Sequence, residues 1–380
     1  MDIKELVSNN DISLPIDVAG AGDDYLGAVK RRVDKYISLV ETAPSTQSDE
    51  FTALQGRVPE LKELNVKLEG IVLNYISGKM EKAVRDFGLL MKSPIVSKNI
   101  LKIKSEIDDR FPNNGAIIEH LYRIRTSEVE IRASKDMFHI PYSKRHMVAT
   151  QRYSISGVPC LYCGGSLFVC WNELGKPDFN NVYLSRLELD ALSKHKKVLD
   201  VSKIPLYFKS KYNDNKLGDS DEDAKITQAA LPYLEIYPLM AYCYCRKRWK
   251  DSSFNIEYII PNLFTQWVMN KKMNIIGIKY YSVHFKSDAY FKKAINYVFP
   301  TRFHRSGDNY CPILKSLFKV TPPVSWKLLE TINDMTYIGN LNLDQDKSLD
   351  EIIPEQYERT TFGKFEAMIS KRAFAAKPIR

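Results

Sequence analysis

Residues 151–174 hold the pattern that most constrains how this chain folds, because turn residues divide a largely apolar stretch into short pieces. An apolar run at 158–163 is bounded by turn residues and predicts a short buried strand. Gly164 and Gly165 predict a turn, and Ser166 is a suitable N-cap for a helix that a glycine and a proline further along would end. The stretch therefore predicts a compact strand–turn–helix unit.

The sequence before this stretch has the periodicity of helices. Apolar residues recur at helical spacing in the segments 23–41, 51–77, 79–91 and 99–110. Phe, Pro, Asn and Gly at 111–115 then form a stop signal. Residues 1–115 therefore predict a helical N-terminal domain without a chemical signature, which indicates a scaffold or an interaction module. A DNA-binding arm is the alternative, although no recognition-helix pattern supports it.

Strand patterns begin after residue 115. Residues 121–125 alternate apolar and basic side chains, so a period of two places Arg123 and Arg125 on one side of a strand. Such a pair can contact a phosphate or form ion pairs at a sheet edge. His139 lies in an apolar turn, and we interpret it as a structural histidine rather than a catalytic base.

The remaining sequence alternates between helical and strand patterns. We expect a strand–helix–strand segment at 181–205, an exposed charged loop at 209–225, a bent helix at 229–249, a helix at 257–268, a strand at 275–284, and closing pieces at 326–333 and 360–371. The longest apolar stretch, 229–245, is interrupted by Glu235 and two prolines and is too short to span a membrane. It therefore predicts a buried helix.

The net charge of +9 favours partners that carry phosphate, such as a nucleotide, a nucleic acid or an anionic membrane. Residues 1–10 contain charges and no apolar core, so we expect a cytoplasmic protein with reduced thiols rather than a secreted or membrane protein. The chain lacks a Walker A loop, a Gly-x-Gly-x-x-Gly fingerprint and a Gly-x-Ser-x-Gly elbow. The sequence signatures of P-loop, Rossmann and α/β-hydrolase enzymes are thus missing.

Four of the six cysteines are spaced in a way that suggests zinc. Cys160 and Cys163 lie three apart in the predicted strand, where such residues point to opposite faces and cannot chelate one ion. Cys243 and Cys245 lie two apart in a predicted helix, which separates them by roughly 200° around the axis. We therefore expect buried, free thiols and no metal.

Three residues around the central stretch have a spacing that carries a family resemblance. Arg152 and Tyr162 are ten residues apart, and Glu173 follows Tyr162 by eleven. Taken singly, each residue fits an ordinary structural role, since Arg and Glu are mostly exposed and a Tyr in a strand mostly belongs to the core. Together, the pattern Arg-Tyr-Ser-x-x-Gly-x-Pro-x-Leu-Tyr before a short helix with Glu resembles the RES domain, a family named for its Arg, Glu and Ser. Ser282, on a predicted strand before an Asn-x-x-x-Pro segment, matches the third named residue.

The resemblance implies an α+β fold similar to the ADP-ribosyltransferases, in which NAD+ binds in a cleft of a split mixed sheet. It would place a RES-like catalytic domain at 116–345, after the helical domain at 1–115 and before a C-terminal segment at 346–380. It also implies an enzyme that cleaves the nicotinamide–ribose bond of NAD+, as a glycohydrolase with water or as a phosphorylase with inorganic phosphate. NAD+ is then a substrate, and no cofactor is required.

The resemblance implies a role for each matched residue. Bond breaking builds positive charge on the ribose, as in glycoside hydrolysis, and Glu173 would stabilise that charge. Arg152 would pair with the pyrophosphate, and Tyr162 would present a flat face to the nicotinamide. Ser282 would hydrogen-bond the substrate and orient Glu173. Tyr153 and Arg123 complete the predicted NAD+-binding set, with Arg152, Tyr162 and Ser282.

Small members of the family are single-domain toxins that a partner antitoxin neutralises. The long helical N-terminal part of this chain departs from that pattern and favours a self-contained or regulated enzyme, such as a phage-defence effector. An antitoxin, a regulatory protein or a second copy of the chain are the partners to consider. The alternatives are an ADP-ribosyltransferase that modifies a macromolecule and a basic nucleic-acid-binding protein with an inactive RES-like domain. The joint pattern of Arg152, Tyr162 and Glu173 disfavours nucleic acid as a partner.

Overall fold

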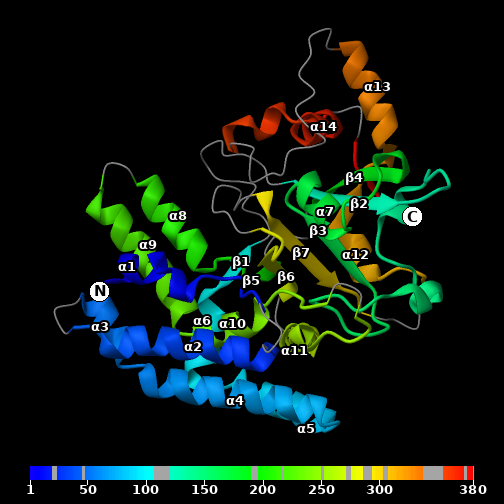
Figure 1. Ribbon diagram of the computed structural model, residues 1–380. Coiled ribbons are helices and arrows are strands. Elements are labelled where there is room, and N and C mark those ends of the chain that lie inside the picture. The colour runs from blue at the N-terminus through cyan, green and yellow to red at the C-terminus, as the bar shows by residue number, and fades with distance from the viewer. Residues whose placement is uncertain are drawn as a thin grey trace. The chain divides into compact units, whose positions relative to one another are not determined.

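The computed structural model describes residues 1–18, 24–44, 48–106, 120–189, 196–215, 218–249, 252–270, 275–285, 293–302, 307–336, 354–371 and 375–379 (Figure 1). The chain forms two compact units. The first, here called the helical unit, consists of Met1–Ser105, Gln151–Ser154 and Leu199–Lys272. The second, here called the sheet unit, consists of Glu106–Thr150, Ile155–Val198 and Met273–Arg380.

The helical unit contains most of the helices that the sequence predicts. Their bounds are α1 (Ile3–Ser8), α2 (Tyr25–Thr42), α3 (Asp49–Gln55), α4 (Val58–Ile76), α5 (Met80–Leu90), α6 (Pro94–Lys102), α8 (Pro205–Asp214), α9 (Ser220–Leu234), α10 (Tyr237–Cys243) and α11 (Ile259–Asn270). Pro59 lies in the first turn of α4, where its missing N–H costs no hydrogen bond, and this explains the break between α3 and α4. The helices expected at 23–41, 51–77 and 79–91 are therefore confirmed.

Helix α10 lies at the centre of the helical unit. All of its residues are buried, as expected for a helix that is apolar on every side. Tyrosine rings pack in the core around it, and their hydroxyls donate hydrogen bonds to backbone carbonyls. Tyr36 stacks on Tyr237 with ring centroids 4.2 Å apart and donates to the Leu234 carbonyl at 2.7 Å. The expectation of a buried helix in this stretch is confirmed, although the chain divides it into α9 and α10.

Three details of the helical unit differ from the sequence expectations. The segment 209–225 is largely helical, because Asp219 caps α9 and Asp221, Glu222 and Asp223 favour the positive N-terminal end of that helix. Helix α6 ends at Lys102 and is followed by β1 (Lys104–Glu106) instead of continuing to residue 110. Cys245 lies beyond α10 and forms an isolated bridge with Ile16. The predicted stop at 111–115 and the predicted boundaries at 115 and 345 lie outside the described residues.

The two compact units do not follow the order of the chain, and the expected domain bounds stay predictions. Residues Leu199–Lys272 follow the RES-like motif in sequence, yet they belong to the helical unit together with Met1–Ser105. Tyrosine hydroxyls and carbonyls join the two segments, as between Tyr237 and Ile12 at 2.9 Å. Periodicity along the chain predicts helices but does not reveal which distant helices share a core.

The sheet unit holds most of a ten-stranded sheet of order β1-β5-β6-β7-β3-β2-β4-β8-β10, with β9 beside β4. The bounds are β2 (Leu121–Thr126), β3 (Cys160–Gly164), β4 (Val182–Leu189), β5 (Lys197–Asp200), β6 (Ile275–Tyr281), β7 (Ile295–Pro300), β8 (Phe318–Val320), β9 (Val324–Ser325) and β10 (Lys377–Pro378), with helices α7 (Leu167–Glu173), α12 (Pro312–Leu317), α13 (Trp326–Thr336) and α14 (Thr361–Ile369). Strand β3 pairs antiparallel with β7, and β7 pairs antiparallel with β6. The predicted α+β class with a helical N-terminal region is confirmed.

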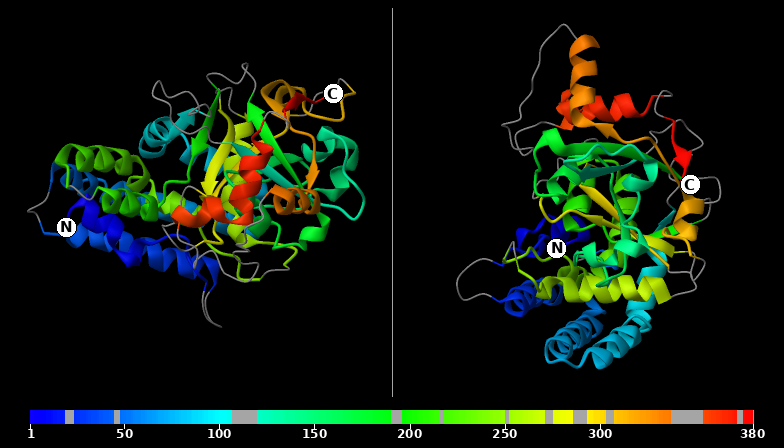
Figure 2. Two further views of the ribbon diagram at one scale, coloured as in Figure 1. Left: turned by 90° about the horizontal axis from the view of Figure 1, so that it is seen from above. Right: turned by 90° about the vertical axis from the view of Figure 1, so that its right-hand side faces the viewer.

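Helix α14 fixes the position of α7. Figures 1 and 2 show the two helices in the sheet unit, where α7 packs on β2, β3 and β7, and α14 packs on α7. The buried Glu366 of α14 accepts a hydrogen bond from the Leu167 N–H at 2.7 Å, so a carboxylate meets the positive end of α7. Tyr357 donates to the same oxygen at 2.7 Å, and Lys293 lies 3.6 Å from the other. Burial nevertheless raises the pKa of Glu366.

Candidate functional site

The strand–turn–helix unit predicted at residues 151–174 is present as β3 and α7. Gly164 ends β3 where a Cβ atom would lie 2.5 Å from Val169 Cγ1 and 2.6 Å from Cys170 Sγ, so only glycine lets the helix approach this closely. Ser166 is the N-cap, and its hydroxyl accepts the Val169 N–H at 3.0 Å. Helix α7 ends at Glu173, and Gly175 follows with a φ of 79°. These local signals bring Glu173 to the C-terminal end of the helix.

The carboxylate of Glu173 is held by two donors that are distant in sequence. Its Oε1 accepts a hydrogen bond from Ser282 Oγ at 2.6 Å and another from Asn296 Nδ2 at 2.7 Å. Its Oε2 lies 3.7 Å from His284 Nε2, and the side chain is 33% exposed. A carboxylate at a helix C-terminus faces the negative end of the helix dipole, and the two donors offset that repulsion. The result is a partly exposed carboxylate with a fixed orientation.

Both donors are buried and held by backbone hydrogen bonds of the sheet. Ser282 is fully buried directly after β6, and its backbone N–H donates to the Ala294 carbonyl at 2.8 Å. Asn296 is also buried and lies in β7, paired with Tyr280 on one side and with Gly164 on the other. Because β6 and β7 are hydrogen-bonded neighbours, the sheet fixes the spacing of the two donors. Such support preorganises the carboxylate before any ligand binds.

Sequence reasoning missed two residues of this cluster. Asn296 entered only as part of a spacing pattern, although an amide on a buried strand must find hydrogen-bond partners and could have been recognised as a candidate on that ground. His284 carried no sequence signal. Its backbone N–H donates to Ser282 Oγ at 3.3 Å, and its half-exposed ring lies beside Glu173. An imidazole at this place can accept a proton or bind an anion.

Tyr162 and Arg123 lie in neighbouring strands of the sheet unit. Arg123 Nη1 donates to the backbone carbonyl of Tyr162 at 2.6 Å, while its buried Nε has no hydrogen-bond partner in the described structure. Burial, followed by the nearby charge of Arg125, lowers the pKa of Arg123 to about 10. Arg125 donates to the Asp136 carbonyl, and burial lowers its pKa as well. A role of Tyr162 and Arg123 in binding NAD+ stays a prediction.

Arg152 and Tyr153 belong to the helical unit, whereas Glu173, Ser282 and Tyr162 belong to the sheet unit. The buried guanidinium of Arg152 donates to the carbonyl of Cys243 at 3.0 Å and to that of Cys245 at 2.8 Å. It also lies 5.0 Å from the Tyr258 ring centroid, and Tyr153 is fully buried nearby in sequence. These bonds satisfy one carbonyl at the C-terminal end of α10 and one just beyond it. The predicted pairing of Arg152 and Tyr153 with NAD+ stays a prediction.

The cysteines of the chain are all free and buried. Burial raises the pKa of Cys160, Cys163, Cys243 and Cys245 to about 12 each. The described residues include no group of three or more His, Cys, Asp or Glu side chains that could hold an ion. The absence of a metal stays a prediction.

His139 has the structural role that its sequence context indicated. The ring is buried, and Nε2 accepts the Cys311 N–H at 2.9 Å while Nδ1 lies 2.8 Å from the Ile140 carbonyl. Burial lowers its pKa to about 4. Both ring nitrogens are therefore engaged by the backbone in the neutral form.

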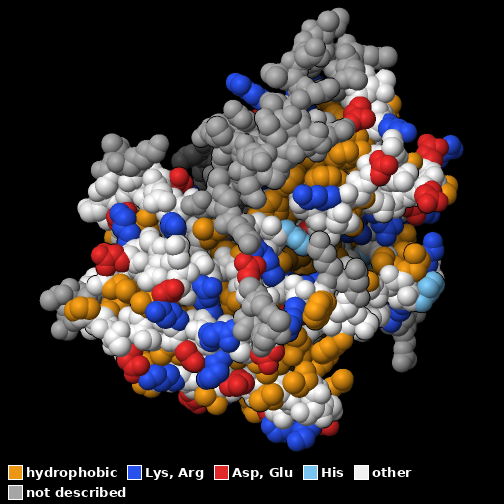
Figure 3. Space-filling view, viewed as in Figure 1, with side chains coloured by type: hydrophobic (Ala, Val, Ile, Leu, Met, Phe, Trp, Pro, Cys, Tyr) orange, Lys and Arg blue, Asp and Glu red, His pale blue; other side chains and the backbone are white. Residues whose placement is uncertain are grey.

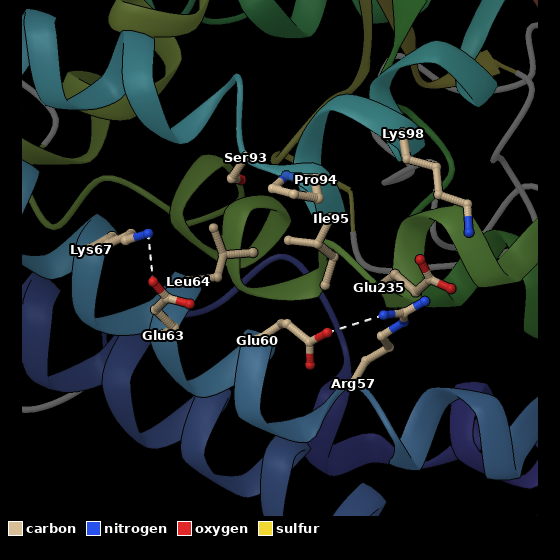
Figure 4. Close-up of a pocket in the computed structure, with 10 residues that line it drawn as sticks. All are labelled: Arg57, Glu60, Glu63, Leu64, Lys67, Ser93, Pro94, Ile95, Lys98 and Glu235. Carbon is tan, nitrogen blue, oxygen red and sulfur yellow. Dashed lines mark hydrogen bonds and ion pairs between the residues drawn. The ribbon is translucent and has the colours of Figure 1, made fainter.

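A cavity of about 330 Å³ in the helical unit is a second concave feature (Figure 4). Its charged lining residues are Arg57, Lys67 and Lys98 with Glu60, Glu63 and Glu235. Arg57 pairs with Glu60 at 3.0 Å, and Lys67 pairs with Glu63 at 2.6 Å. The lining charges balance and largely satisfy one another, so the cavity shows no preference for a charged ligand.

Comparison with known proteins gives one similar sequence. The chain is 28% identical over 370 residues to the Bacillus subtilis (strain 168) protein described as "Putative toxin YopC", and the match covers 94% of this chain and 78% of that protein. No family model and no solved structure matches the chain. The RES membership and the ADP-ribosyltransferase-like arrangement therefore stay predictions. No helix in the described part of the chain is long and apolar enough to cross a membrane.

Proposed function

We propose that this protein is a toxin-like enzyme that cleaves the nicotinamide–ribose bond of NAD+. The observation that carries the proposal is the carboxylate of Glu173, oriented by Ser282 and Asn296 and partly open to solvent. Similarity to a protein described as a toxin, over nearly the whole chain, supports the toxin-like role. Because NAD+ depletion harms the cell that makes the enzyme, the proposal includes an inhibitory partner and action in the cytoplasm.

The reaction requires no strong general acid, because the leaving group is neutral. As the C1′–N bond breaks, its electron pair stays on the nicotinamide nitrogen, which leaves neutral, and positive charge develops on the ribose. Glu173 stabilises that charge with a carboxylate already fixed in place. A water or phosphate oxygen then attacks C1′. When water is the acceptor its proton must leave, and the ring of His284, 3.7 Å from Glu173, is placed to receive it.

The decisive experiment measures nicotinamide release from NAD+ by the purified full-length protein, with and without inorganic phosphate. We expect one nicotinamide for each soluble ADP-ribose or ADP-ribose phosphate formed. If the NAD+ is labelled in its adenylate part, label that remains on added protein or nucleic acid would instead indicate a transferase. An intact NAD+ pool together with salt-sensitive binding of nucleic acid would support the basic binding protein and contradict the proposal.

Replacing Ser282 by Ala should lower kcat about tenfold with little change in KM for NAD+. A hydrogen bond to a charged group contributes about 1.5–3 kcal/mol, and Asn296 still holds the same carboxylate oxygen. Steady-state kinetics measure both constants. Ser316, an exposed serine of α12 that bonds the Ile313 carbonyl, gives a matched Ser→Ala control. An unchanged kcat in the Ser282 variant would show that Ser282 does not position the reacting carboxylate.

A further inference from the structure

A groove on the helical unit lies between α5 and α11 and has a volume of about 280 Å³. Its lining residues are Val84, Arg85, Phe87, Gly88 and Leu89 from α5, Lys92 just after α5, and Leu263, Gln266, Trp267 and Asn270 from α11. Figure 3 shows hydrophobic side chains gathered over these two helices, at the lower front. The groove shares no residue with the Glu173 site, which belongs to the sheet unit.

Apolar side chains are concentrated on this part of the surface. Of the thirteen large hydrophobic residues that are exposed in the described structure, six lie in α4 and α5: Val66, Leu73, Ile76, Met80, Val84 and Leu89. Within α5, Met80 and Val84 are four residues apart, and the same spacing leads to Gly88 in the groove. Two of the six, Val84 and Leu89, line the groove, and exposed apolar side chains of this kind are typical of a protein interaction site.

Gly88 makes the groove deeper than the helix surface would otherwise be. A Cβ atom added at Gly88 would meet no atom within 4 Å, so the position opens onto empty space. Glycine in the middle of a helix is unfavourable relative to alanine, and here it creates room above the backbone. A side chain from a partner can fill that room.

The charge of the groove points to the partner. Arg85 and Lys92 are the charged residues in the described lining, and no carboxylate is among them. Asp86, 3.8 Å from Arg85, is also bound by Lys82 at 2.7 Å. A symmetric contact between two copies of this chain would bring the same cations together, which disfavours a homodimer. An anionic membrane favours a protruding apolar face over a concave groove.

We propose that this groove binds an acidic amphipathic α-helix of a partner protein. The apolar stripe of that helix lies on Leu89, Trp267 and the space above Gly88, and its flanking carboxylates face Arg85 and Lys92. The proposal rests on the helical unit alone and is independent of the reaction at Glu173.

The test uses the full-length protein and a panel of fluorescein-labelled amphipathic peptides. Each carries Leu, Phe or Trp at positions i, i+3 or i+4, and i+7, with Glu at the remaining positions, and a second set has Lys in place of Glu. Gly88→Leu fills the groove, and Gly70→Leu in α4 is the matched control because a Cβ there also meets no atom within 4 Å. Both substitutions should leave the melting temperature equal to or above that of the original protein.

We expect at least one Glu peptide to bind, with affinity at least tenfold weaker for Gly88→Leu and unchanged for Gly70→Leu. Binding should weaken as salt is raised, and the Lys peptides should not compete. Three results would overturn the proposal: no Glu peptide binds, Gly88→Leu binds as well as the original protein, or the Lys peptides bind equally. Gly88-dependent dimerisation in light scattering, or Gly88-dependent binding to phosphatidylserine vesicles in place of the peptides, would assign the groove to another occupant.

Discussion

Replacing Glu173 by Gln should reduce NAD+ cleavage about 100- to 1000-fold, equivalent to about 3–4 kcal/mol of transition-state stabilisation. Gln keeps the shape of the side chain, and its carbonyl oxygen can take the place of Oε1 and accept from both Ser282 and Asn296. Only the negative charge is lost. Because the positive charge on the ribose develops in the transition state, kcat should fall while NAD+ affinity changes little.

Three measurements on the Glu173→Gln variant separate chemistry from folding: nicotinamide release, NAD+ affinity and the melting temperature. Glu130 provides the matched control, since it is an exposed glutamate of the sheet unit that pairs with the exposed Arg132. Glu130→Gln should leave all three quantities unchanged. If Glu173→Gln cleaves NAD+ at the original rate, Glu173 is not the stabilising carboxylate and the proposed mechanism is wrong.

The strand–turn–helix unit that carries Glu173 could be predicted because its signals are local. Ser166, Gly164 and Gly175 each act on the backbone of neighbouring residues, and they fix where α7 begins and ends. The helical pattern before residue 103 is local in the same sense. A single sequence carries this information directly, and the bounds of α2 and α5 follow the predicted ones closely, whereas α6 ends at Lys102 rather than at residue 110.

The parts that could not be predicted depend on pairing between distant segments. Asn296 becomes a donor to Glu173 only because β7 pairs with both β3 and β6, and no local pattern specifies that register. The guanidinium of Arg152 is satisfied by carbonyls more than ninety residues further along the chain. Its surroundings therefore became apparent only from the fold, and they give it a role that the family resemblance did not suggest.

Replacing Arg152 by Met should destabilise the helical unit by about 3 kcal/mol and lower its melting temperature by roughly 6–12 °C. Met fills much of the same volume but donates no hydrogen bond, so the buried carbonyls of Cys243 and Cys245 lose the partners that the structure provides. Leaving a buried polar group without a partner typically costs about 1–3 kcal/mol. Thermal and denaturant unfolding measure the change.

The same variant distinguishes the two roles of Arg152. If its guanidinium is committed to the end of α10, NAD+ affinity measured well below the melting temperature should be nearly unchanged. If it binds the pyrophosphate instead, Arg152→Met should weaken NAD+ binding strongly and leave the melting temperature close to that of the original protein. Arg152→Lys adds a graded step, because an ammonium cannot reproduce the fork that reaches both carbonyls and should restore only part of the lost stability. The exposed Arg132 serves as the control, and Arg132→Met should shift stability by less than about 0.5 kcal/mol. A stable Arg152→Met protein with impaired NAD+ binding would support the role in substrate binding that the sequence context of Arg152 predicts.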